Sequence, residues 1–166
     1  MLLKVRLRTN LMEYVEVYCV EKRLINSGRR YSYLTSEIEA IYHEAAQKFE
    51  LSDSALRILY TICLVGDVCP LSVTIRLSGI SKQTVNSSLR NLERHGALYL
   101  KTAGGKKKNI YLTEKGQALV EQSAMQVIKI ENAILSSWTQ ADQNAYIELT
   151  ERFLSEFREK VRRLTV

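Results

Sequence analysis

Apolar residues recur every three or four positions along most of this chain, which is the spacing of a helix with one buried face. The pattern predicts helices over residues 11–26, 34–49, 53–65, 71–78, 82–95, 114–136 and 140–164. Residues that can cap a helix stand at the start of most of these segments: Asn10, Ser36, Ser52, Ser81, Thr113 and Thr139. Gly28 is expected to end the first helix.

Two short segments do not follow the helical spacing. Residues 97–102 and 109–112 are rich in Leu, Tyr and Ile, and the sequence Gly104-Gly-Lys-Lys-Lys108 lies between them. Strand-forming residues on both sides of a glycine turn predict a β-hairpin. The predicted fold class is therefore mainly α, with one small β-hairpin.

The segment from Leu77 to Thr84 predicts a tight corner between two helices. Gly79 interrupts the first helix and Ser81 can cap the second, whose buried side would carry Val85, Leu89 and Leu92. Two helices joined by a short turn containing glycine are typical of a helix-turn-helix. With the hairpin after it as a wing, the segment predicts a winged helix-turn-helix.

The polar side of the helix at 82–95 carries side chains of the types that can hydrogen-bond to DNA bases. Gln and Asn can bond adenine, Arg can bond guanine, and Ser can bond either base. Glu93 lies toward the flank and is the one acid between Ser81 and Lys108, a segment with seven Lys and Arg. We expect this recognition helix to contact double-stranded DNA through Ser81, Lys82, Gln83, Thr84, Ser87, Arg90, Asn91 and Arg94. An ordinary solvated surface is the other interpretation of this face.

Three consecutive lysines at the predicted hairpin tip, Lys106, Lys107 and Lys108, give a second candidate contact with DNA. Ammonium groups without neighbouring acids suit phosphate oxygens, and a thin hairpin can approach a minor groove. Lysines also protect the edges of hairpins from aggregation, which is the alternative interpretation.

The amino-acid composition excludes several other classes of protein. The 166 residues carry a net charge of +6, and 46% of them are hydrophobic, which suits a single domain with a real core. No segment is apolar enough to span a membrane, and the charged N-terminus lacks a secretory signal, so we expect a cytoplasmic protein. Cys19, Cys63 and Cys69 lack the spacing of metal ligands, and neither histidine lies in a catalytic arrangement. We expect no enzyme activity, no metal and no cofactor.

The helices at 114–136 and 140–164 would each be about 35 Å long. A compact chain of this size has a radius of gyration of only about 15 Å, so these helices would span the domain or protrude from it. A protruding apolar stripe favours burial against a second copy of the chain. We expect a homodimer whose interface includes Ile38, Tyr146, Leu149, Phe153, Phe157 and Val161.

From about Leu34 to Leu164 the chain resembles MarR-type transcriptional regulators. The resemblance rests on Gly79-Ile-Ser-Lys-Gln-Thr-Val85, Leu92-Glu-Arg-His-Gly96 and Tyr111-Leu-Thr-Glu-Lys-Gly116, and on the order of the helices. It implies a homodimer on a pseudo-palindromic operator, usually a repressor released by a small-molecule effector or by oxidation. Lys106 stands where the family's wing usually has Arg, and residues 1–30 extend beyond the family's usual start.

These inferences divide the chain into three regions. Residues 1–33 form an N-terminal extension that is expected to be helical, residues 53–113 bind DNA, and residues 34–52 and 114–166 dimerise. The expected function is that of a sequence-specific transcriptional regulator. The alternatives are a winged-helix module that binds protein and a regulator that senses oxidation through Cys19.

Overall fold

The computed structural model describes residues 27–66, 68–105 and 107–165, and the chain divides into two units, residues 1–45 and 46–166. The helix expected over 11–26 lies outside the described residues. The first described helix, α2, spans Ser27–Lys48. It begins seven residues before the expected start at residue 34. Gly28 and Ser36, which were expected at helix ends, both lie inside it. The Ser36 hydroxyl donates to the carbonyl of Ser32 within the helix instead of capping a new one.

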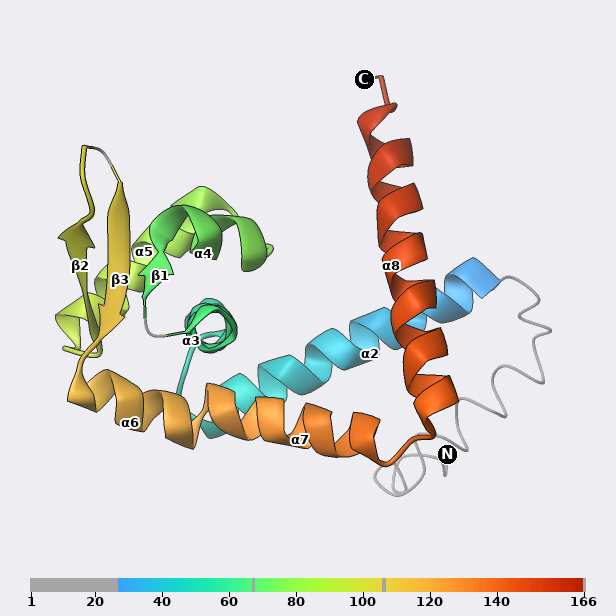
Figure 1. Cartoon of the computed structure of the whole chain (residues 1–166), viewed down its shortest axis with the longest axis horizontal. Coiled ribbons are helices and arrows are strands. Elements are labelled where there is room, and N and C mark those ends of the chain that lie inside the picture. Colours follow the sequence, from blue (N-terminus) through green and yellow to red (C-terminus); the bar gives the residue numbers. More distant parts are fainter. Residues whose placement is uncertain (1–26, 67, 106, 166) are drawn as a thin grey trace, which may run out of the picture. The chain divides into compact units, whose positions relative to one another are not determined.

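The second unit is mainly helical (Figure 1). Its elements are α3 (Asp53–Val65), β1 (Cys69–Pro70), α4 (Leu71–Leu77), α5 (Lys82–Arg94), β2 (Leu98–Thr102), β3 (Lys108–Leu112), α6 (Glu114–Gln122), α7 (Ala124–Ser136) and α8 (Gln140–Arg162). The helix-turn-helix is α4 and α5, and the wing is β2 and β3. No helix among the described residues is long and apolar enough to cross a membrane.

Helix α3 lies at the centre of the core. It packs against α4, α5, α6 and α7, and its Ile58 and Leu59 are fully buried. Helix α5 packs against it, and Val85 and Leu89 on the apolar side of α5 are buried, as the helical spacing predicts. These contacts fix α5 by one side and leave its polar side in solvent.

The sheet has three strands rather than the two of the predicted hairpin, in the order β1-β3-β2. Strand β1 has only two residues, and its Cys69 pairs with Ile110 of β3. The Cys69 side chain is buried, with its Sγ 3.1 Å from Oγ1 of Thr74 in α4. The base of the wing is therefore attached to the helix-turn-helix by a strand that the sequence pattern did not predict.

Thr113 and Gly116 close the junction between the wing and α6. The Thr113 hydroxyl accepts the N–H of Gly116 at 3.0 Å and donates to the carbonyl of Gly96 at 2.6 Å. A Cβ atom on Gly116 would lie 1.8 Å from the carbonyl oxygen of Ala97, so this position has no room for a side chain. The Thr-x-x-Gly pattern thus joins α6 to the loop before β2.

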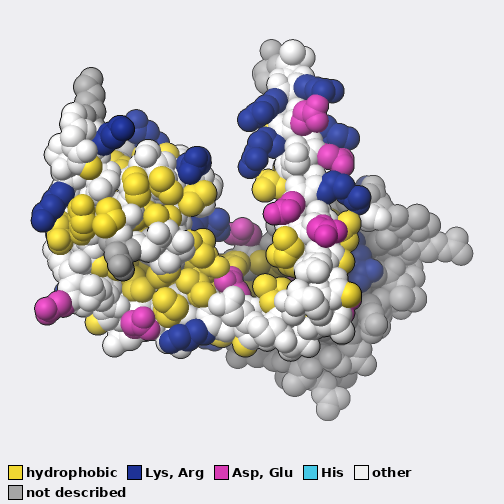
Figure 2. All heavy atoms as spheres, in the orientation of Figure 1, with side chains coloured by type: hydrophobic (Ala, Val, Ile, Leu, Met, Phe, Trp, Pro, Cys, Tyr) yellow, Lys and Arg dark blue, Asp and Glu magenta, His cyan; other side chains and the backbone are white. Residues whose placement is uncertain are grey.

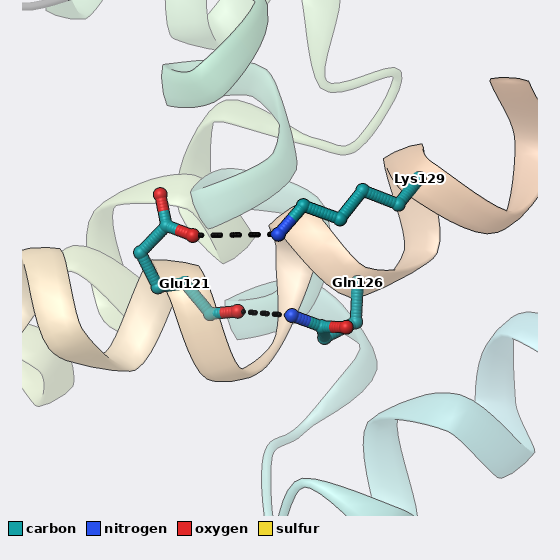
Figure 3. A network of polar contacts seen from close by, with 3 residues as sticks. All are labelled: Glu121, Gln126 and Lys129. Carbon is teal, nitrogen blue, oxygen red and sulfur yellow. Dashed lines mark hydrogen bonds and ion pairs between the residues drawn. The ribbon is translucent and has the colours of Figure 1, made fainter.

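The single helix expected over 114–136 is divided at Ser123, whose backbone is not helical (φ −129°, ψ −92°). The buried Ser123 hydroxyl donates to the carbonyl of Leu119 at 2.5 Å. Side chains from α7 join the end of α6 across the break (Figure 3): Nε2 of Gln126 donates to the Glu121 carbonyl at 2.7 Å, and Nζ of Lys129 lies 3.7 Å from Oε2 of Glu121. The apolar spacing continues through the break, so the sequence did not reveal it.

Candidate nucleic-acid interface

Helix α5 presents the predicted recognition surface. Its N-terminus is capped by Ser81, whose Oγ accepts the N–H of Thr84 at 3.1 Å. The side opposite the core is polar and, apart from the half-buried Thr84 and Asn86, exposed. The structure therefore brings together on this side the residues expected to read DNA, which are Ser81, Lys82, Gln83, Thr84, Ser87, Arg90, Asn91 and Arg94.

An open hollow of about 570 Å³ lies along this side of α5. It is lined by Lys82, Gln83, Asn86, Ser87 and Arg90. Asn86 was not among the predicted contacts, although its spacing could have identified it: it follows Gln83 by three residues and precedes Arg90 by four. An amide at this place adds a donor and an acceptor to the surface.

Hydrogen bonds organise the C-terminal end of α5. Nη2 of Arg94 donates to Oδ1 of Asn91 at 2.7 Å, and Nδ1 of His95 lies 2.8 Å from the Asn91 carbonyl. Arg94 and Asn91 thus form one bonded pair.

A serine pair fixes the middle of α5 to the start of α3. The Ser88 hydroxyl donates to Oγ of Ser54 at 2.7 Å, and Ser54 lies 3.3 Å from the Ser52 hydroxyl, which caps α3. Ser88 lies between the polar and apolar sides of the helix, so helical spacing alone does not identify it. Its bond limits how far α5 can turn on the core.

A second hollow, of about 220 Å³, separates α5 from the wing. Arg90 and Lys108 line it from the two sides, together with Leu71, Asn86, Leu89, Glu93 and Leu100. Glu93 was expected toward the flank of α5, and it lines this hollow beside Arg90. Two cations from different elements therefore meet around one space, and one carboxylate reduces their combined charge.

The basic residues of the wing lie at different distances from the hairpin tip and on both faces of the hairpin. The N–H of Ala103 donates to the Lys107 carbonyl at 2.9 Å, closing a turn in which Gly104 and Gly105 have positive φ angles. Thr102 pairs with Lys108 and Lys101 pairs with Asn109. Because successive side chains of a strand point to opposite faces, Lys108 lies on the face toward α5 and Lys101 on the outer face. Lys106 lies outside the described residues.

The two described cysteines lack the features of reactive thiols. Burial raises the pKa of the Cys63 thiol and that of the buried Cys69, so both carry less thiolate than a free cysteine at neutral pH. Cys19 lies outside the described residues. Within 27–66, 68–105 and 107–165, no three His, Cys, Asp or Glu side chains gather as metal ligands would.

Helix α8 carries a second candidate surface. None of its residues is buried, although its apolar side chains follow helical spacing. Figure 2 shows hydrophobic side chains on its N-terminal half and Lys and Arg toward its C-terminal end. The predicted interface residues are all exposed: Tyr146, Leu149, Phe153, Phe157 and Val161 on α8, and Ile38 on α2.

Comparisons with known proteins identify the fold. No protein-family model and no curated protein matches the chain. Among solved structures, it is similar to MepR of S. aureus in complex with DNA, at 20% identity over 80% of this chain and 98% of MepR, with a TM-score of 0.63.

Two other solved structures give the same result. BpsR of Bordetella bronchiseptica, solved in a study of how 6-hydroxynicotinic acid regulates its DNA binding, is 18% identical over 75% of this chain and 98% of its own, with a TM-score of 0.57. A MarR-family transcriptional regulator of Silicibacter pomeroyi is 17% identical over 76% and 88%, with a TM-score of 0.60. The chain therefore has the winged helix-turn-helix fold of MarR-family transcriptional regulators.

Proposed function

We propose that this protein is a DNA-binding transcriptional regulator that acts as a homodimer on a pseudo-palindromic operator, as a repressor. The observation that carries the proposal is the polar side of α5, which is exposed and lies beside a wing with basic residues on both faces. Seven Lys and Arg and one Glu occur between Ser81 and Lys108. A charge excess concentrated in one segment fits a polyanion better than a generic solvated surface does.

Recognition would use both elements of the winged helix. Helix α5 lies in the major groove, where Gln83 and Arg90 reach the base edges, and the wing tip approaches the adjacent minor groove. The hollow shared by Arg90 and Lys108 then faces the phosphate backbone between the two grooves. MepR, which has the same fold, has been solved on DNA, and this supports the proposed docking.

Dimerisation would bury the apolar side of α8. An amphipathic helix with no buried residue leaves its apolar stripe in water, and a second copy of the same helix is the partner that closed symmetry supplies. In this proposal residues 34–52 and 114–166 form the dimer, and residues 53–113 bind DNA. Helix α2 already begins at Ser27, so the proposed extension, residues 1–33, includes its first residues.

Release of the operator would follow binding of a small-molecule effector in the cytoplasm. The DNA binding of BpsR is regulated by 6-hydroxynicotinic acid, and that precedent supports the proposal for a chain of the same fold. The rival oxidation mechanism depends on Cys19, because the raised pKa values of Cys63 and Cys69 make these two thiols poor sensors.

Fluorescence anisotropy on a labelled duplex of arbitrary sequence at low salt tests DNA binding. We expect binding that weakens steeply with salt, and a marked loss on Arg90→Glu. The matched control is Arg152→Glu on α8, which changes the charge equally and should bind like the wild type. Sequencing the genomic DNA that the purified protein retains would then identify the operator. A wild-type protein that binds no duplex at low salt would refute the proposal and favour a protein-binding module.

A further inference from the structure

The outer face of the wing carries an aromatic pair with a lysine above it. The rings of Tyr99 and Tyr111, on β2 and β3, are stacked with centroids 5.4 Å apart and planes 12° from parallel. Nζ of Lys101 lies 5.2 Å from the Tyr99 centroid and 5.7 Å from the Tyr111 centroid. One ammonium group is thus shared between two ring faces.

The register of the hairpin produces this arrangement. Tyr99 pairs with Tyr111, and Lys101 pairs with Asn109 in the next row on the same face. Leu100 and Ile110 alternate with them and point toward the core, where Ile110 is buried. Alternation therefore separates an apolar inner face from an outer face of two tyrosines, a lysine and an amide.

The two tyrosine rings restrict the position of the Lys101 ammonium group, which would otherwise move freely in solvent. An ammonium group is attracted to the electron-rich face of an aromatic ring at this distance. Lysine is a flexible side chain, and holding it in one place before binding reduces the entropy lost when it contacts a ligand. Lys101 is exposed, and among the described residues no Asp or Glu forms an ion pair with it. Its charge is therefore available to an anion.

The height of Lys101 on the wing matches the rim of a DNA groove. Lys101 precedes Gly104 at the tip by three residues, which is about 10 Å along a strand. The minor groove is about 7.5 Å deep. When the tip reaches into the groove, Lys101 therefore lies at the level of the phosphates. Lys108 lies at a similar height on the opposite face, in the hollow with Arg90.

We propose that Lys101 binds a DNA phosphate on the outer side of the wing, and that Tyr99 and Tyr111 are its positioning residues. The inference rests on the proposed function of the α5 and wing surface. Lys108 and Arg90 contact the backbone on the side of α5, and Lys101 contacts the backbone across the minor groove. The wing then contacts the phosphates on both sides of the minor groove, and this requires a cation on each face of the wing.

The salt dependence of binding tests this contact on a duplex of about 30 base pairs, or three helical turns, of arbitrary sequence. Lys101→Met keeps most of the apolar stem over the rings and removes the charge. In a dimer it removes up to two phosphate contacts, which lowers the slope of log affinity against log salt by up to about 1.8. Each lost contact weakens binding by about eightfold at 0.1 M salt. Lys101→Arg should restore the wild-type slope.

Lys115→Met is the matched control, because it removes the same charge from an exposed position in α6, at the end of the hairpin away from the tip. We expect a wild-type slope for this variant. Equal slopes for Lys101→Met and the wild type would overturn the inference while leaving the proposed function intact. A wild-type protein that binds no DNA would overturn both, so the two failures are distinguishable.

The positioning role has its own test. Tyr99→Phe keeps the ring and should bind like the wild type, whereas Tyr99→Leu removes it and should weaken binding several-fold with Lys101 present. In the Lys101→Met background, Tyr99→Leu should have no further effect, because the group that it positions is gone. Additive losses in the double variant would show that Tyr99 acts independently of Lys101, and would refute its positioning role. Thermal unfolding of each variant verifies that the wing is folded.

Discussion

The dimer proposal makes a strong prediction for Phe153 and Phe157. Their rings stack with centroids 5.7 Å apart on the apolar side of α8, and the two residues are 43% and 56% exposed. A phenylalanine side chain carries about 200 Å² of surface, so the pair leaves about 200 Å² for a partner to cover. Two protomers would bury about 400 Å² through these four rings, which is worth up to about 10 kcal/mol at 25 cal/mol per Å².

Changing both residues to Asp removes that contribution and places four carboxylates in an apolar interface, where an unpaired charge is very unfavourable. A loss of about 10 kcal/mol raises the dimer dissociation constant by roughly seven powers of ten. We expect a protein that sediments as a monomer at micromolar concentration. Sedimentation velocity measures this directly.

A second readout comes from Trp138, the only tryptophan in the chain, whose ring lies edge-on to Tyr146 at 5.3 Å at the start of α8. Its fluorescence should change with dilution in the wild type and not in the Asp variant. The matched control carries Arg152→Asp and Ser155→Asp, two acids on the opposite side of α8, and should remain a dimer. An intact dimer of the Phe153 and Phe157 double variant would refute the assignment of α8 to the interface.

Four further predictions concern the DNA surface, the fold and the cysteines. Arg90→Ala should lower affinity for the preferred operator by roughly 1–3 kcal/mol and affinity for random duplex by less; equal losses in anisotropy titrations would mean that Arg90 only binds phosphate. Replacing Lys106–Lys108 with Ala should lower the salt slope by about two to four while keeping the ranking of operators, and an unchanged slope would support a purely protective role for these lysines. Gly116→Ala forces a Cβ against a backbone carbonyl and should lower stability by roughly 1–3 kcal/mol, measured by urea unfolding; wild-type stability would show that the junction can relax. In a protein that carries Cys19→Ser and Cys63→Ser, Cys69 should react with iodoacetamide more slowly than free cysteine, with a rate that rises only at a pH above the ordinary thiol pKa, and fast reaction at neutral pH would contradict the burial argument.

The exposed polar side of α5 was largely predictable from sequence because its determinants are local. Ser81 and Thr113 each cap a helix through a bond to the backbone three residues on, and residue order alone reveals such bonds. The apolar residues of α5 repeat at helical spacing, so its solvent side followed directly. Alternation along β3 likewise could have shown that Lys108 and Asn109 face opposite ways.

Most of the features that the sequence did not reveal depend on contacts between distant residues. Strand β1 is two residues long and exists because Cys69 meets Ile110, so no alternating pattern could indicate it. The stacked tyrosines depend on the register of β2 and β3, and the Ser88–Ser54 bond joins residues 34 positions apart. Ser123 interrupts a helix whose apolar spacing continues on both sides.

The break at Ser123 also has a consequence for the folding of the chain. A continuous helix from 114 to 136 would have an unbroken series of backbone hydrogen bonds. At Ser123 side-chain hydrogen bonds replace part of that series (Figure 3). Local opening needs less free energy where fewer backbone bonds must be broken. Amide protons around residue 123 should therefore exchange with solvent earlier than those at the centres of α6 and α7. The break would then be the place where α6 and α7 begin to open, although both helices pack against α3.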